Sequence, residues 1–164
     1  MIENTNPFLT VSHTPFETTP FHLIKTKHFE PAMEEGMKVH NQEVDAIVNC
    51  PDAPTFANTI VALEKSGALL DRVTTVFGNL LSAETNDELE ALAERMMPRL
   101  SEHSNNISLN EQLFARIKQV YEQTDQQTLS QEERMLLQNT YNSFIRNGAN
   151  LAPEIGRASC RERV

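Results

Sequence analysis

The fold is decided by residues 55–82, TFANTIVALEKSGALLDRVTTVFGNLLS. Apolar residues recur here at steps of four and three, a spacing that places them on one face of a helix. They are Phe56, Ile60, Leu63, Leu70, Phe77 and Leu81, with Gly67 and Thr74 in the same series and a second stripe at Leu69, Val73, Val76 and Leu80. A helix apolar over so much of its circumference is typical of the centre of a bundle. We therefore predict one continuous central helix.

The central helix carries two further expectations. Phe56, Leu63, Leu70 and Phe77 lie on its most apolar face, so we expect them to be almost fully buried. Gly67 and Gly78 lower helix propensity, and we expect each to permit a close helix crossing.

Periodic segments on both sides predict four more helices. The first covers about residues 30–48 and is ended by CPDAP at 50–54. The next begins at the N-cap Asn86 and bends or ends at Pro98. Its buried face is expected to contain Leu89, Leu92, Ala93, Met96, Met97 and Leu100.

The last two helices have clear start signals. One begins near Asn110, and the other opens with the capping box SQEE at 130–133 and stops at Gly148. Their inward residues are expected to be Leu113, Phe114, Ile117, Val120 and Tyr121, then Leu137, Tyr141, Phe144 and Ile145. No alternating strand pattern of useful length occurs, so the predicted fold is an all-α antiparallel bundle of about five helices.

The two ends of the chain differ from this helical region, which we place at 28–154. Residues 1–27 contain Pro7, Pro15 and Pro20 and predict an extended N-terminal arm, pinned by its isolated aromatic residues. Residues 155–164, IGRASCRERV, have no apolar period and reverse the charge trend, and Glu154 before them belongs to the same stretch. They resemble a sequencing-adapter read-through, so we expect a loosely attached, non-native tail.

Composition excludes several function classes. The formal net charge of −9 and the lack of a basic cluster argue against nucleic acid as a partner. No apolar run is long enough for a membrane span, and Cys50 and Cys160 do not make a disulfide framework. The first residues show no signal peptide, which favours a cytoplasmic location.

A search for metal-binding or catalytic residues finds no complete set. A zinc peptidase helix needs two histidines one turn apart with a glutamate between them, and neither His40 nor His103 has a second histidine four residues on. His40 and Glu43 share a helix face, but a carboxylate-bridged metal site needs that motif repeated. We interpret His40 as a packed histidine.

The other candidates are equally incomplete. His13, His22 and His28 are isolated in the arm, and Cys50 has no base nearby in the sequence. The methionines Met33, Met37, Met96 and Met97 favour core packing over a peptide groove. These residues alone describe a helical bundle and name no reaction.

Several longer stretches, however, resemble one family in a single collinear register over residues 4–151. They are NPFL at 6–9, TPF at 14–16, PFHLI at 20–24, HFEPA at 28–32, PTFANTI at 54–60, ALEKSG at 62–67, LDRV at 70–73, FGNL at 77–80, SAETN at 82–86, HSNNI at 103–107 and FIRNGA at 144–149. They are similar to the opening of the thimet-oligopeptidase-like metallopeptidases, above all bacterial peptidyl-dipeptidases and oligopeptidase A. Ala57 departs from the acidic residue typical at that position.

The resemblance implies an N-terminal, channel-wall portion of a zinc peptidase that acts on short peptides, either by peptidyl-dipeptidase or by oligopeptidase activity. The zinc, held by a His-Glu-x-x-His helix and a later glutamate, would belong to a missing C-terminal catalytic domain. We therefore assign no catalytic, cofactor-binding or metal residue to this chain and expect the fragment alone to be inactive. The alternative is a non-catalytic helical adaptor that binds a partner peptide or helix.

Overall fold

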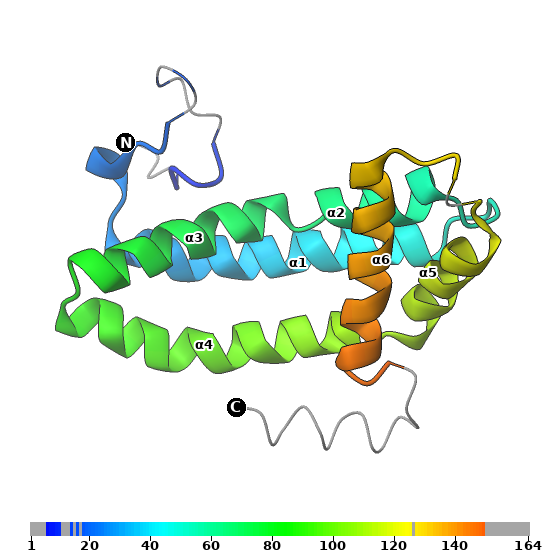
Figure 1. The fold of residues 1–164 in the computed structure, drawn as a ribbon. Helices are drawn as coiled ribbons and strands as arrows, with labels where there is room; N and C mark the ends of the chain where they lie inside the picture. Colours follow the sequence, from blue (N-terminus) through cyan, green and yellow to red (C-terminus); the bar gives the residue numbers. More distant parts are fainter. Residues whose placement is uncertain (1–5, 11–13, 15, 17, 126, 150–164) are drawn as a thin grey trace. The chain divides into compact units, whose positions relative to one another are not determined.

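The computed structural model describes residues 6–10, 14, 16, 18–125 and 127–149, and in these residues every regular element is helical (Figure 1). The long α-helices are α1 (Phe29–Val48), α3 (Ala68–Ala83), α4 (Asp87–Ser108), α5 (Glu111–Gln123) and α6 (Gln131–Arg146). Shorter pieces are the 3₁₀ turns η2 (Phe21–Leu23) and η3 (Thr26–His28), the π-helix η4 (Phe56–Val61) and α2 (Ala62–Lys65). The prediction of an all-α fold with five main helices is confirmed.

The central helix is not continuous, so the prediction of one helix over residues 55–82 is wrong. The chain forms η4 and α2, breaks at Ser66 and Gly67, and then forms α3. Gly67 has a φ of 74°, in the left-handed region, where glycine has no steric penalty. Ser66 is extended, so two residues interrupt the helical backbone while the apolar spacing of the sequence continues through them.

The helices form two compact units, each with its own hydrophobic cluster, instead of one shared core. The first unit contains residues 1–40 and 67–100, and the second contains residues 41–66 and 101–164. The break at Gly67 coincides with the boundary between them. The continuous domain expected at 28–154 therefore has an internal division into two cores, while its outer limits stay a prediction.

In the first unit, α3 runs antiparallel to the first part of α1 and packs closely on it. Phe29 and Phe77 meet edge to face, with ring centroids 5.2 Å apart. Farther along, a Cβ placed on Gly36 would lie 3.0 Å from the Leu70 Cα. Gly36 therefore permits the close crossing that we expected at Gly78, where a Cβ would meet nothing within 4 Å.

The core of the first unit comes from the arm, α1, α3 and α4. Its buried members are Phe8, Phe29, Ala32, Met33, Leu70, Val73, Val76, Phe77, Leu89, Leu92 and Met96. Burial of Leu70 and Phe77 is as predicted, with exposed fractions of 9% and 1%. Met97 is 43% exposed, so its placement on the buried face was wrong: Met96 alone of the two faces the core.

The core of the second unit is formed by the end of α1, η4, α5 and α6. It buries Val44, Ile47, Ile60, Leu113, Phe114, Ile117, Val120, Leu137 and Phe144. Phe56 and Leu63 pack against it but are only partly buried, because in η4 and α2 it is Thr59 and Ile60 that point fully inward. Tyr121, Tyr141 and Ile145 are also partly buried, at the edge of the same cluster.

α4 continues through Pro98 to Ser108, so of the two predicted effects of the proline, a bend or an end, the end does not occur. Proline in a helix interior removes one backbone hydrogen bond and costs about 3 kcal/mol. The residues on both sides offset this cost by burial: Met96 is fully buried and His103 is 8% exposed.

The predicted helix caps are confirmed. The Asn86, Asn110 and Ser130 side chains accept the backbone N–H groups of Leu89, Leu113 and Glu133. The Glu133 carboxylate accepts the Ser130 N–H in return, which completes the capping box. At the end of α6, Gly148 has a φ of 93°, and the N–H groups of Gly148 and Ala149 donate to Ile145 and Phe144. This pattern is a Schellman motif.

The described part of the arm is fixed to the first unit through Phe8, which is 3% exposed. The arm is not uniformly extended, since residues 21–23 and 26–28 form 3₁₀ turns. Its other aromatic residues do not pin it: Phe16 and Phe21 are exposed. The tail at 155–164 lies outside the described residues.

Candidate functional site

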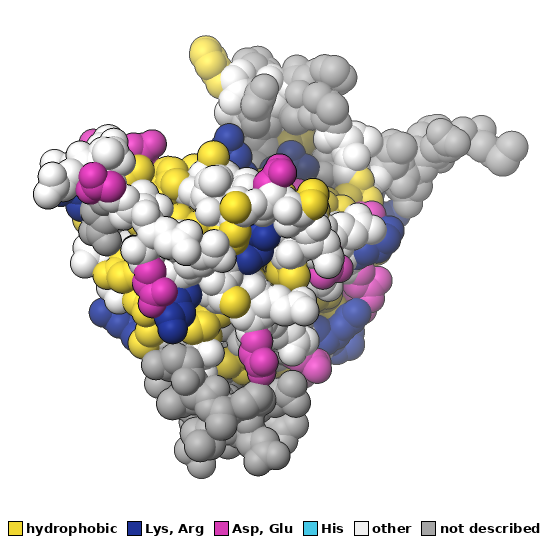
Figure 2. All heavy atoms as spheres, turned by 90° about the vertical axis from the view of Figure 1, so that its right-hand side faces the viewer, with side chains coloured by type: hydrophobic (Ala, Val, Ile, Leu, Met, Phe, Trp, Pro, Cys, Tyr) yellow, Lys and Arg dark blue, Asp and Glu magenta, His cyan; other side chains and the backbone are white. Residues whose placement is uncertain are grey.

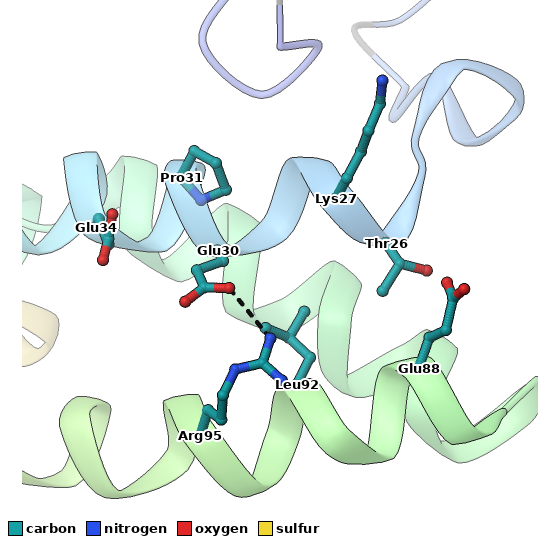
Figure 3. A pocket seen from close by; sticks show the side chains of 8 residues that line it. All are labelled: Thr26, Lys27, Glu30, Pro31, Glu34, Glu88, Leu92 and Arg95. Atoms are coloured by element: carbon teal, nitrogen blue, oxygen red, sulfur yellow. Dashed lines mark hydrogen bonds and ion pairs between the residues drawn. The ribbon is translucent and has the colours of Figure 1, made fainter.

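A pocket of about 570 Å³ lies in the first unit, between the start of α1 and α4 (Figure 3). It is lined by Thr26, Lys27, Glu30, Pro31, Glu34, Glu88, Leu92 and Arg95. Figure 3 shows the Glu30 carboxylate and the Arg95 guanidinium pointing toward one another from the two helices. Five of the eight lining residues carry a charge, and Pro31 and Leu92 contribute apolar surface.

Two ion pairs fix the register of α1 against α4 along this pocket. Arg95 binds Glu30 at 3.2 Å and Arg99 binds Glu34 at 2.8 Å. Each pair joins residues 65 apart, and four residues separate the two pairs on each helix, so the helices run parallel here. The side chains are 40–57% exposed, which limits each pair to a contribution of at most about 1 kcal/mol. The pairs therefore orient the helices more than they stabilise them.

His28 lies at the junction of the arm and α1 and is 7% exposed. Its Nδ1 accepts the Lys25 N–H at 3.1 Å, and its buried Nε2 has no hydrogen-bond partner. Burial lowers the pKa of this imidazole, and the positive charges of Lys27 and Lys25 lower it further. His28 is therefore a neutral structural histidine whose Nδ1 closes the turn before α1.

The remaining histidines do not meet at one site. The His40 ring packs against Gly67, with its Nδ1 2.9 Å from the position of a Cβ on that glycine. This contact agrees with the interpretation of His40 as a packed residue. His103 is buried in α4, and His22 is exposed in η2. His13 lies outside the described residues.

These residues do not fit a zinc ion. Zinc in proteins takes three or four nitrogen, sulfur or carboxylate ligands at about 2.0–2.3 Å. In the part of the chain that the structure describes, no group of three or more His, Cys, Asp or Glu side chains is placed to hold a metal. The lack of assigned metal residues stays a prediction, because His13 and Cys160 lie outside the described residues.

Cys50 lies at the turn after α1 as a free, half-buried thiol. The Arg116 guanidinium donates to the Cys50 carbonyl at 3.1 Å and to the Asp52 carbonyl at 3.3 Å. These bonds fix the CPDAP turn to α5. They involve the backbone rather than the thiol, so the arrangement provides no base for a nucleophilic cysteine.

Three of the four methionines weighed as core or groove residues lie in the core. Met33 and Met96 are fully buried, and Met37 packs against the first cluster.

Sequence reasoning missed the contacts that tie distant segments together, namely Glu30 to Arg95 and Arg72 to the Phe8 carbonyl. The four-residue spacing of Glu30 and Glu34, matched by Arg95 and Arg99, was the available signal.

Among the helices of the described residues, none combines the length and the apolar character of a membrane span.

No family model matches the chain. The chain is 44% identical over 151 residues to a dipeptidyl carboxypeptidase of Salmonella typhimurium and 42% identical over 147 residues to that of Escherichia coli. It is also 27% identical over 150 residues to oligopeptidase A of Escherichia coli. These matches cover 90–92% of this chain but only 22% of each relative.

The matches define an all-helical region that is homologous to part of a group of peptidases. Within that group, the chain is related to the bacterial dipeptidyl carboxypeptidases, with oligopeptidase A as a more distant relative. The resemblance expected from the sequence is therefore confirmed. Because the chain spans about a fifth of these relatives, their activity as whole proteins comes to it only as a proposal.

Proposed function

We propose that this chain is a channel-wall portion of a zinc peptidase that hydrolyses short peptides, and that it limits peptide access rather than cleaving the bond. The observation that carries the proposal is the 44% identity to a dipeptidyl carboxypeptidase over 92% of the chain. The active residues and the zinc would lie in the part of the relatives that this chain does not match, which is the larger part of their length.

The local structure supports a passive role for these residues. The Glu30–Arg95 ion pair lines the pocket, and the described side chains of the pocket include no nucleophile beside a base. The two hydrophobic clusters and the confirmed caps build rigid helices, which suit a wall that must keep its shape. The proposed partners are short peptide substrates and the remaining catalytic part of the same enzyme.

A chimera tests the proposal. The matched 151 residues of the Salmonella relative are exchanged for the corresponding residues of this chain. We expect the chimera to release dipeptides from the C-terminus of a fluorogenic peptide at a rate within about tenfold of the parent, and to leave a folded protein substrate intact. The matched control is the parent with the same residues deleted, which we expect to lose either its folding or its discrimination against long substrates.

The 164-residue chain by itself is the second arm of this test. We expect no hydrolysis of the same peptide and no tightly held zinc after dialysis. A folded chimera without peptidase activity contradicts the channel-wall proposal and favours the helical adaptor. One zinc per isolated chain at nanomolar affinity contradicts the assignment of the metal to the rest of the enzyme.

A further inference from the structure

Exposed hydrophobic side chains are concentrated in the N-terminal arm. Among the described residues, six large hydrophobic side chains are at least 43% exposed, and four of them lie in residues 9–23. These four are Leu9 at 46%, Phe16 at 99%, Phe21 at 53% and Leu23 at 52%. On the face shown in Figure 2, by contrast, hydrophobic side chains lie dispersed among polar ones. We call residues 9, 10, 14, 16 and 18–23 the arm loop.

The base of the arm loop is tied to the first unit at both ends. The Asn6 amide donates to the His28 carbonyl at 2.7 Å, which joins the residues before and after the loop. Next to Asn6, Phe8 enters the core and packs on Phe29 with ring centroids 5.1 Å apart, while Arg72 donates to the Phe8 carbonyl. The residues on both sides of the arm loop are therefore held on the first unit, while the described apolar side chains of the loop are exposed.

The tied base explains why the exposed side chains do not turn into the core. Phe8 and Phe77 both already pack against the Phe29 ring. The core of the first unit therefore has its aromatic residues in place without the arm loop. Leu9, Phe21 and Leu23 remain in water, where apolar surface is unfavourable.

The composition of this segment is also that of a buried surface. Residues 6–24 contain a single charged residue, Glu17, in a chain in which 23% of the residues are charged. The central part of a protein interface is depleted in charge and enriched in aromatic side chains. An exposed apolar segment with this composition marks an interaction site.

From the exposure of these side chains and the fixed base of the loop, we propose that the arm loop is a docking surface for the remaining, catalytic part of the same polypeptide. This inference rests on the proposed function and adds to it the contact that joins the helical wall to the rest of the enzyme. Leu9, Phe16, Phe21 and Leu23 are the side chains that insert into this partner.

The length of the relatives selects this occupant over a second copy of the chain. The matched region is 22% of each dipeptidyl carboxypeptidase, so most of the relative's polypeptide is covalently joined to it. A joined partner is present at a millimolar effective concentration, which lets a few apolar side chains secure it without a large separate interface. A second copy would have to bind through the same few side chains at its free concentration.

The experiment compares the arm loop in the isolated chain and in the chimera with the Salmonella relative. The variant is the triple substitution Leu9→Ser, Phe21→Ser and Leu23→Ser, and the control is Met135→Ser on α6, where the methionine is 54% exposed. Both are made in both proteins. Thermal unfolding and amide hydrogen exchange of residues 6–28 are measured in each.

In the chimera, we expect the arm-loop amides to exchange at least tenfold more slowly than in the isolated chain. The triple variant should return them to fast exchange and lower the Tm of the chimera by several degrees. In the isolated chain the same variant should leave the Tm unchanged within about 2 °C, because exposed substitutions away from the core have small effects. Met135→Ser should leave the Tm unchanged in both proteins.

The result that overturns the docking surface is a folded chimera that hydrolyses peptide while its arm loop exchanges as fast as in the isolated chain. A dimer of the isolated chain that the triple variant dissociates also overturns it, in favour of a second copy. Failure of the proposed function is a different result, since it is the loss of peptidase activity in a chimera whose loop is protected.

Discussion

Alanine at Gly67 and alanine at Gly78 should change stability in opposite directions. Gly67 has a φ of 74°, and its Cβ would lie 2.9 Å from the His40 ring. A non-glycine residue in the left-handed region costs about 1–2 kcal/mol, and displacing the ring adds to that. The lower entropy of the unfolded chain returns about 0.4–1 kcal/mol. We therefore expect Gly67→Ala to lower the free energy of unfolding by about 1–3 kcal/mol.

Gly78 is the matched control because it lies inside α3 with no atom within 4 Å of its Cβ position. Alanine in a helix interior is favoured over glycine by about 0.5–1 kcal/mol, so Gly78→Ala should stabilise the protein by that amount. Urea unfolding followed by circular dichroism at 222 nm measures both changes. If residues 55–82 formed one straight helix, both substitutions would stabilise.

The two contributions at Gly67 separate in a double-mutant cycle with His40→Ala. With the ring removed, Gly67→Ala should cost only the backbone part, about 1 kcal/mol. The reasoning is refuted if Gly67→Ala stabilises the protein as Gly78→Ala does. The part of the reasoning that concerns the His40 ring is refuted if Gly67→Ala lowers the free energy of unfolding by the same amount with and without that ring.

Three further outcomes follow from burial, charge and capping. Phe77→Ala should lower the free energy of unfolding by about 3–5 kcal/mol. Phe21→Ala should lower it by less than about 1 kcal/mol, because Phe21 is 53% exposed. Equal losses would mean that the aromatic cluster around Phe77 is not a core. The pKa of His28 is lowered in the folded state, so as the pH falls the His28 imidazole is protonated first in the unfolded state. The contribution of His28 to the free energy of unfolding is therefore fully present above about pH 6.5 and is lost at lower pH. His28→Gln should make the free energy of unfolding depend less steeply on pH between pH 7.5 and 5. An unchanged slope of this pH dependence would contradict the reasoning. Ser130→Ala should cost about 1 kcal/mol through loss of the capping box, and a neutral result would show that α6 does not depend on its cap.

The sequence by itself determined where α4, α5 and α6 begin and where α6 ends, because these signals depend on short-range chemistry. The Asn110 and Ser130 caps use side chains three residues from the N–H groups that they satisfy. The stop at Gly148 needs only a residue that accepts a positive φ. The family resemblance also rests on short stretches in one register, and the homologous peptidases confirm it.

The tertiary structure decided which of the possible helix breaks are real. Pro98 and Gly67 are both breaking residues, yet the helix continues through Pro98 and stops at Gly67. Burial of Met96 and His103 offsets the hydrogen bond that Pro98 removes. At Gly67 the backbone is left-handed, and a Cβ would lie 2.9 Å from the ring of His40, 27 residues away. This contact has no local sequence signal.

The tertiary structure also decided the partners of charged and apolar groups. The Glu30–Arg95 pair joins residues 65 apart, and the Phe8 carbonyl meets Arg72 on α3. Periodicity shows that a side chain faces inward, but not which helix it faces, because every helix of a bundle offers a similar apolar stripe. For the same reason, the membership of the two hydrophobic clusters, one from the arm, α1, α3 and α4 and one from the end of α1, η4, α5 and α6, was found only in the folded structure.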